Sequence, residues 1–188
     1  MENIQSNKIN LNKKKILLRL DLNVPLKNGK ITDTNRIDKI IPTIQFLLKK
    51  NSKIIIVSHV GRPKGKKVTS LSLKPICEMI SKKINEKVSF IDKDLKTFDN
   101  KNIFRTEKEN IVMLENLRFY EEEEKNNKEF AKKLASFGEI YVNDAFSCSH
   151  RSHASVVEIA SLLPSFAGIQ LNSEINALKK ITSQIKKP

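Results

Sequence analysis

The sequence predicts an α/β fold, a parallel β-sheet covered by helices on both of its faces. Short apolar runs typical of buried strands alternate along the chain with longer segments whose apolar residues recur at helical spacing. Strands and helices in this alternation are joined by right-handed βαβ crossovers, which produce a parallel sheet. A chain of 188 residues, 39% of them hydrophobic, is long enough to bury the core of one such domain without disulfides or a metal. We therefore expect a Rossmann-like three-layer domain.

The predicted strands are short and aliphatic. The clearest is Ile54–Val57, four consecutive β-branched residues that suit a strand buried on both faces. We expect five strands, at residues 16–20, 53–58, 88–91, 111–114 and 139–142.

The predicted helices lie between and after these strands. In the first of them, apolar side chains at positions 37, 40, 41, 44, 47 and 48 form one face. We expect five helices, at residues 36–50, 73–87, 127–137, 153–162 and 173–187. Gly138 directly follows the third helix and is expected to end it, because glycine is favoured just after a helix C-terminus.

The net charge of +14 points to an anionic ligand or partner, and nucleic acid is one alternative. Only six of the 35 basic residues are arginines, so most of the charge is lysine of the kind that covers solvated helix faces. Two tyrosines and no tryptophan are available for stacking on bases, and no RNP-like or helix-turn-helix signature occurs. We expect no nucleic-acid partner, and we regard the arginines as the informative charges.

Several segments bear on the cellular setting. No apolar run approaches the ~20 residues that span a bilayer. Residues 1–12 are polar and lack the apolar core of a secretory signal. Cys77 and Cys148 are too few and too far apart to form a disulfide framework. These observations favour a reduced, cytoplasmic location without membrane association.

Polar segments follow four of the predicted strands, and they hold most of the arginines and all the histidines of the chain. Ligands of open parallel sheets bind beyond the carboxyl ends of the strands. Guanidinium groups that converge there form a cage for carboxylate or phosphate oxygens. We expect Asp21 and Asn23 to orient these arginines or to accept hydrogen bonds from ligand hydroxyls. The arginines and histidines of these segments are Arg36, Arg62, Arg118 and Arg151, and His59, His150 and His153.

Five segments resemble signature motifs of phosphoglycerate kinases, in the order in which that family has them. The resemblance covers nearly the whole chain. It implies the half of such a kinase that binds 3-phosphoglycerate, the acceptor of a phosphoryl group from ATP in glycolysis. The segments are Arg19-Leu-Asp-Leu-Asn-Val-Pro-Leu26, Ser58-His-Val-Gly-Arg-Pro63, Leu114-Glu-Asn-Leu-Arg-Phe119, Val142-Asn-Asp-Ala-Phe146 and His150-Arg-Ser-His-Ala-Ser155.

The resemblance also implies roles for individual residues. Arg36 is implied to be catalytic, because it would stabilise charge on the phosphoryl group during transfer. Asp21 as a general base is an alternative, but a carboxylate acceptor needs no deprotonation, so an orienting role is favoured. A basic cage without a nucleophile suffices for phosphoryl transfer. The implied substrate contacts are Asp21, Asn23, Arg36, His59, Arg62, Arg118 and Arg151.

The sequence departs from the family pattern at two points. Ser147-Cys148-Ser149 stands where the family usually has small residues such as Gly-Thr-Ala, and Leu22 stands where it often has Phe. We expect both changes to be tolerated.

The chain carries no recognisable nucleotide-binding motif. Neither GxGxxG nor GxxxxGK[ST] occurs; Gly61–Lys66 resembles the latter, but it is one residue short and lacks the Ser or Thr. Family members are longer and bind ATP with Mg²⁺ in a second α/β domain. We expect residues 1–170 to form the 3-phosphoglycerate-binding domain and residues 171–188 to begin the interdomain helix. The resemblance then implies that the C-terminal domain, its partner, is absent, and we expect the isolated chain to be an inactive monomer that binds no nucleotide.

The sequence admits three further interpretations. Cys148, His150 and His153 are zinc-competent residue types, but no fourth ligand accompanies them, so we expect no metal. The acidic run Glu121–Glu124 is expected to be a solvated helical segment. A truncated, non-catalytic relative that acts as a binding partner is a third class of function.

Overall fold

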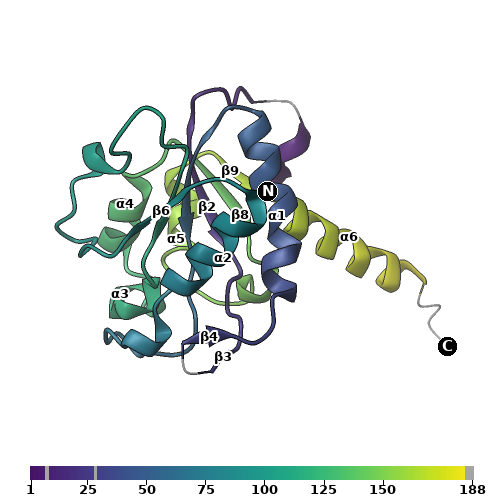
Figure 1. Cartoon of the computed structure of the whole chain (residues 1–188). Coiled ribbons are helices and arrows are strands. Elements are labelled where there is room, and N and C mark those ends of the chain that lie inside the picture. Colours follow the sequence, from purple (N-terminus) through teal and green to yellow (C-terminus); the bar gives the residue numbers. More distant parts are fainter. Residues whose placement is uncertain (7–8, 28, 185–188) are drawn as a thin grey trace.

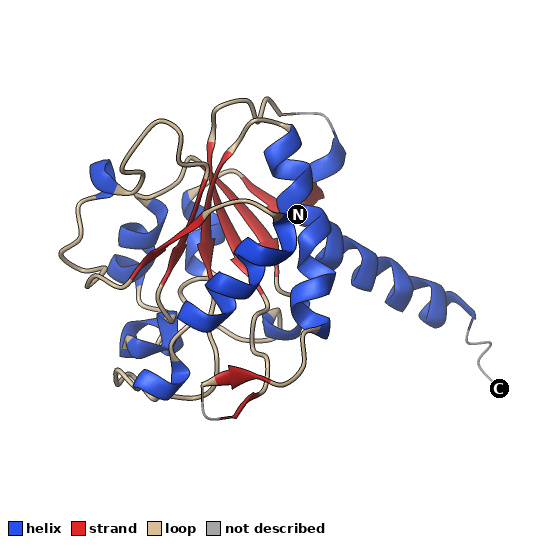
Figure 2. Cartoon of the chain, viewed as in Figure 1, coloured by secondary structure: helices blue, strands red, loops and turns tan. Residues whose placement is uncertain are grey.

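A seven-stranded sheet forms the centre of the fold in the computed structural model, which describes residues 1–6, 9–27 and 29–184 (Figures 1 and 2). Every neighbouring pair of its strands is parallel, in the order β1-β9-β8-β2-β5-β7-β6. A separate antiparallel pair joins β3 (Leu26–Lys27) and β4 (Lys30–Ile31). The strands of the sheet are β1 (Glu2–Asn3), β2 (Lys15–Leu20), β5 (Lys53–Val57), β6 (Val88–Ile91), β7 (Ile111–Leu114), β8 (Ile140–Asp144) and β9 (Ser165–Ala167).

Helices cover both faces of this sheet, so the expected α/β fold class is confirmed (Figure 2). The core on one face contains residues of α1 (Asn35–Lys49) and α2 (Lys74–Ile84), and the core on the other contains residues of α4 (Lys128–Ala135) and α5 (Glu158–Leu162). The short α3 (Glu121–Glu124) precedes α4, and α6 (Ile169–Gln184) projects from the body of the domain (Figure 1). Single 3₁₀ turns occur at η1 (Ile4–Ser6), η2 (Thr69–Leu71), η3 (Asn100–Asn102), η4 (Leu117–Phe119) and η5 (Phe146–Cys148).

The central strand β2 shows how the two cores are divided. Ile16, Leu18 and Leu20 belong to the core beneath α1 and α2, whereas Leu17 belongs to the core beneath α4 and α5. Successive side chains of a strand point to opposite faces, so Arg19 lies on the same face as Leu17. The strand therefore carries one charged side chain into an otherwise apolar layer.

The structure corrects the sequence prediction at the C-terminal end of the chain. The segment 153–162, expected to be one helix, is helical only over Glu158–Leu162. The strand β9 follows it; this strand was not predicted and lies second from the edge of the sheet. The helix expected at 173–187 begins earlier, at Ile169; residues 185–187 of that prediction lie outside the described residues. No helix in the described part of the chain is long and apolar enough to span a membrane.

Glycine does not end α4 in the way we expected. The helix stops at Ala135, its C-cap is Ser136, and Gly138 does not take a left-handed conformation. A Cβ at Gly138 would instead lie 3.0 Å from the Leu17 Cβ. The glycine is therefore explained by close approach to β2. The sequence also predicts a turn at Asn28-Gly29; Asn28 lies outside the described residues, and Gly29 has φ +72°.

Candidate functional site

The candidate site lies where β2, β5, β7 and β8 end, because parallel strands present their carboxyl ends at one edge of the sheet. The segment after each strand contributes side chains, and α1 adds Arg36 near its N-terminus. The predicted site residues fall into an exposed group around Arg36 and a buried group around His59 and Arg118.

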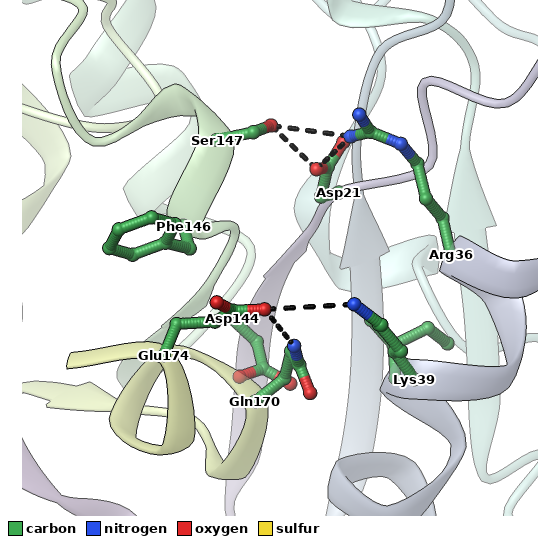
Figure 3. A pocket seen from close by; sticks show the side chains of 9 residues that line it. Asp21, Arg36, Lys39, Asp144, Phe146, Ser147, Gln170 and Glu174 are labelled. Atoms are coloured by element: carbon green, nitrogen blue, oxygen red, sulfur yellow. Dashed lines mark hydrogen bonds and ion pairs between the residues drawn. The ribbon is translucent and has the colours of Figure 1, made fainter. Parts of the chain in front are cut away.

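Arg36 forms a small polar triangle with Asp21 and Ser147 (Figure 3). Its Nη1 donates to Asp21 Oδ2 and, at 3.4 Å, to Ser147 Oγ. Ser147 Oγ in turn donates to Asp21 Oδ2 at 2.5 Å. The triangle joins the loop after β2, the start of α1 and the η5 turn after β8.

A cavity of about 190 Å³ opens beside this triangle (Figure 3). Lys39 also lines it, one turn further along α1 than Arg36. Glu174 of α6 accepts a hydrogen bond from Gln170 at 2.8 Å and lies 3.7 Å from Lys39 Nζ. Acidic and basic groups thus both line the cavity, and Arg36 forms part of its wall.

Asn23 fixes the turn that carries Arg62. Asn23 Oδ1 accepts a hydrogen bond of 2.9 Å from the Gly61 N–H, and Arg118 Nη1 donates to the Gly61 carbonyl at 2.9 Å. Gly61 has φ +65°, and a Cβ there would lie 2.7 Å from a methyl carbon of Leu71, so this position requires glycine. Arg62 is exposed, and no hydrogen bond or ion pair within the described residues ties it to the other site residues.

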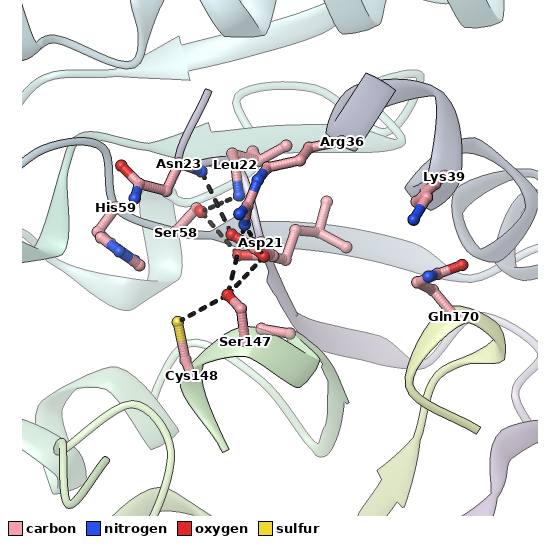
Figure 4. Close-up of polar contacts among 12 residues, drawn as sticks. Asp21, Leu22, Asn23, Arg36, Lys39, Ser58, His59, Ser147, Cys148 and Gln170 are labelled. Carbon is pink, nitrogen blue, oxygen red and sulfur yellow. Dashed lines mark hydrogen bonds and ion pairs between the residues drawn. The ribbon is translucent and has the colours of Figure 1, made fainter. Parts of the chain in front are cut away.

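His59 is buried immediately beyond β5, and its Nδ1 lies 2.8 Å from Nη2 of Arg19 (Figure 4 shows His59 beside Ser58). Burial is the main cause that lowers the pKa of His59 far below its ordinary range, and the charges of Arg19 and Arg118 act in the same direction. The ring is therefore neutral at physiological pH.

Arg118 is buried without enough partners. Its Nη1 donates to Gly61, but Nε and Nη2 are buried and make no hydrogen bond. Nε lies 3.6 Å from the carboxylate of Glu124. Burial lowers the pKa of Arg118, which Glu124 partly offsets and the nearby Arg151 reinforces. Buried donors without partners are costly, so this guanidinium is suited to an anion that completes its hydrogen bonds.

The acidic run on α3 is not uniformly solvated, contrary to our expectation. Glu123 is fully buried, and its carboxylate accepts hydrogen bonds from Ser155 N–H at 2.9 Å and Ser155 Oγ at 2.5 Å. Burial raises the pKa of Glu123. The segment that carries Arg151 and His153 is thereby fastened to α3, because the Ala154 N–H also donates to the Glu123 carbonyl at 2.9 Å.

Sequence reasoning assigned no site role to Arg19, Ser147, Glu123 or Ser155. The signal for Arg19 was present, since a charged residue within an apolar strand requires a buried partner. His150 is exposed and His153 is buried, and among the described residues no group of three or more His, Cys, Asp or Glu side chains is arranged to hold a metal.

The fold and the site define an open α/β domain with a cluster of basic side chains at the carboxyl ends of its parallel strands. The sequence profile of the family described as phosphoglycerate kinase matches residues 6–188. The chain belongs to the phosphoglycerate kinase family.

Individual relatives support this assignment. The chain is 48% identical over 175 residues to the phosphoglycerate kinase of Wolbachia pipientis subsp. Culex pipiens (strain wPip), covering 93% of this chain and 44% of that protein. It superposes on the structure of phosphoglycerate kinase from Coxiella burnetii with a TM-score of 0.85 and 38% identity, covering 97% of this chain and 46% of the other. The Pyrococcus horikoshii OT3 enzyme gives a TM-score of 0.87 at 31% identity, covering 100% and 47%. The chain thus spans a little under half the length of these relatives.

Proposed function

We propose that this chain is the 3-phosphoglycerate-binding half of a phosphoglycerate kinase, which converts ATP and 3-phosphoglycerate to ADP and 1,3-bisphosphoglycerate. The proposal rests on Arg118, whose buried Nε and Nη2 make no hydrogen bond. Arg118 lies near His59 and Arg151, so that donors and positive charge gather at this point. A small ligand with several anionic oxygens supplies the acceptors that Nε and Nη2 lack. The substrate contacts are Asp21, Asn23, Arg36, His59, Arg62, Arg118 and Arg151.

The two groups of the site contribute differently to phosphoryl transfer. The buried guanidinium and imidazole hold the acceptor substrate by charge and by directed N–H groups. Arg36, at the wall of the cavity, stabilises the charge of the transferring phosphoryl group, while Asp21 orients it. A second domain, the C-terminal half of the longer relatives, supplies the ATP and Mg²⁺ site, so this chain alone is inactive. As part of a glycolytic enzyme it acts as a cytoplasmic monomer together with that domain.

Binding is tested by NMR titration of the chain with 3-phosphoglycerate at millimolar concentrations. We expect saturable shifts that include His59, and at least tenfold weaker binding in Arg118→Met. Arg105→Met is the matched control, because Arg105 is exposed and its backbone N–H bonds Glu109 in a different part of the chain. Equal loss in both variants, or no saturable binding to the wild-type chain, contradicts the proposed ligand.

Inactivity is tested separately with ATP, Mg²⁺ and 3-phosphoglycerate in a coupled assay. We expect no turnover by the chain alone. ADP formation that depends on 3-phosphoglycerate, and that Arg36→Met abolishes, would overturn this part of the proposal.

A further inference from the structure

A line of buried polar side chains lies behind the site. Arg19, Glu123 and Ser155 are each 0% exposed, and His59 is 2% exposed. Arg19 Nε donates to Ser155 Oγ at 3.0 Å, and Ser155 Oγ donates to Glu123 at 2.5 Å. At the other end of the guanidinium, Nη2 lies 2.8 Å from His59 Nδ1. The line therefore runs from α3 through β2 to His59, the second residue after β5.

Arg19 is held rigidly in this line. Its Nη1 donates to the Leu20 carbonyl and, at 3.3 Å, to Ser58 Oγ. All three guanidinium nitrogens thus have a partner within the domain. Arg19 has no partner-free nitrogen to offer a ligand, which distinguishes it from Arg118.

The direction of each hydrogen bond in the line follows from chemistry. A guanidinium only donates, so Ser155 Oγ accepts from Arg19 and must direct its own proton to Glu123. For the same reason His59 Nδ1 must accept from Arg19. A ring nitrogen that accepts carries no proton.

We propose that Arg19, held in place by Ser155 and Glu123, is a positioning residue that locks His59 in the neutral tautomer with its proton on Nε2. His59 then acts in the site as a fixed hydrogen-bond donor, neither a base nor a cation. A single N–H donor suits a carboxylate or phosphate oxygen, so this inference deepens the proposed function and rests on it for the identity of the ligand.

The surroundings of His59 act in the same direction. Arg19 from β2, Arg118 from η4, and Arg151 and His153 from the loop after η5 all oppose a positive charge on the ring. Glu123 is the nearby acid in the line, and its carboxylate is directed to Ser155. Protonation of His59 is therefore disfavoured over the range in which an ordinary histidine titrates.

The tautomer is measured directly by long-range ¹H–¹⁵N NMR on ¹⁵N-histidine-labelled chain without ligand. Three histidines are present, and His150→Gln and His153→Gln assign the third. We expect His59 to show a protonated Nε2 and an unprotonated Nδ1, unchanged from pH 8 to pH 5. A protonated Nδ1, or a titration near the ordinary histidine pKa, overturns the proposal.

The role of Arg19 is tested by Arg19→Met. We expect loss of the single-tautomer pattern, with both neutral forms present. The pKa of His59 should rise but stay below its ordinary value, because burial and Arg118 still oppose a positive charge on the ring. If that variant does not fold, Arg19→Met/Glu123→Gln removes both buried charges, so that no uncompensated charge remains, and tests the same point. A folded variant that keeps the pure Nε2–H form shows that Arg19 does not set the tautomer.

Cys148→Ala is the matched control, because its Sγ lies 3.9 Å from the same Arg19 nitrogen but takes no part in the line. It should leave the spectrum of His59 unchanged. The experiment contains no ligand, so failure of the chain to bind 3-phosphoglycerate leaves the tautomer result standing, and a wrong tautomer leaves the proposed substrate standing.

Discussion

The two halves of the site hold their charges in different ways. The buried half (Arg19, His59, Arg118, Glu123 and Ser155) lies at 2% exposure or less, and the hydrogen bonds among its members are shielded from water. The exposed half (Asp21, Arg36 and Ser147) is a triangle in which the Arg36 side chain is 44% exposed. Interactions in a low-dielectric interior are stronger and costlier to leave incomplete than those in water. Under the proposed function, the buried half holds the substrate in one pose and the exposed half follows the phosphoryl group that moves.

The largest expected effect comes from breaking the buried half at Glu123. Glu123→Ala removes the acceptor of both Ser155 hydrogen bonds and leaves Arg19 without the acid at the end of its line. Removing one member of a buried charged network costs roughly 3–5 kcal/mol. We expect a loss of unfolding free energy of that order in urea denaturation at pH 7.

Glu122→Ala is the matched control on the same short helix. Glu122 pairs with Lys96 near the surface, and surface pairs contribute about 1 kcal/mol or less. Equal losses for the two variants would show that the burial of Glu123 has no energetic consequence.

The second prediction concerns pH. Burial first, and then Arg118, lower the pKa of His153 to about 4, from an ordinary value near 6.5. The unfolded chain therefore protonates His153 more readily than the folded chain does. The contribution of neutral His153 to the free energy of unfolding is complete above pH 6.5 and is lost as the pH falls toward 4. Glu123 and Asp144, whose pKa values burial raises, act in the opposite direction.

A comparison of variants separates the contribution of His153 from that of the other titrating groups. Between pH 7 and pH 4.5 we expect the wild-type chain to lose roughly 2 kcal/mol more than His153→Gln, as measured by urea denaturation. His150→Gln, at an exposed position, should behave like the wild type. Parallel pH profiles for all three chains would show that His153 is not held neutral by the fold.

The same division explains what the sequence predicted. Strand tips and their arginines are local features: an apolar run followed by a polar motif places Arg36, His59 and Arg118 at one edge of the sheet. Burial of a charge is not local. Glu123 differs from its three acidic neighbours only in the direction in which it leaves α3, and that direction depends on packing against the Ser155 segment. The short strand β9 likewise owes its existence to pairing with β1 and β8.

In the exposed half, Asp21→Asn removes the ion pair with Arg36 and should hardly change stability. Pairs at the surface contribute about 0–1 kcal/mol, and water competes here for the Arg36 side chain, which is 44% exposed, more than for the Asp21 side chain, which is 15% exposed. We expect a change in unfolding free energy below about 1 kcal/mol, together with a several-fold loss of 3-phosphoglycerate affinity as Arg36 loses its orientation. Asp92→Asn, at an exposed position after β6, is the control for both measurements. A stability loss as large as that of Glu123→Ala would show that the two halves do not differ.

The smallest expected effect is at Ser147, where the family usually has a small residue of another type. Ser147→Ala removes the hydroxyl that donates a hydrogen bond to Asp21 and accepts one from Arg36. The ion pair between Arg36 and Asp21 remains. A typical intramolecular hydrogen bond contributes only about 0.5–1.5 kcal/mol, and water can replace both bonds of the exposed Ser147 hydroxyl. We expect a change in unfolding free energy below about 0.5 kcal/mol and a change in 3-phosphoglycerate affinity of no more than about threefold. Ser149→Ala, two residues further on, removes only a 3.4 Å bond to the Ala145 carbonyl and should change neither quantity. A tenfold loss of affinity in Ser147→Ala alone would mean that the triangle is as firmly ordered as the buried half, since only a rigid exposed group makes one hydroxyl that important.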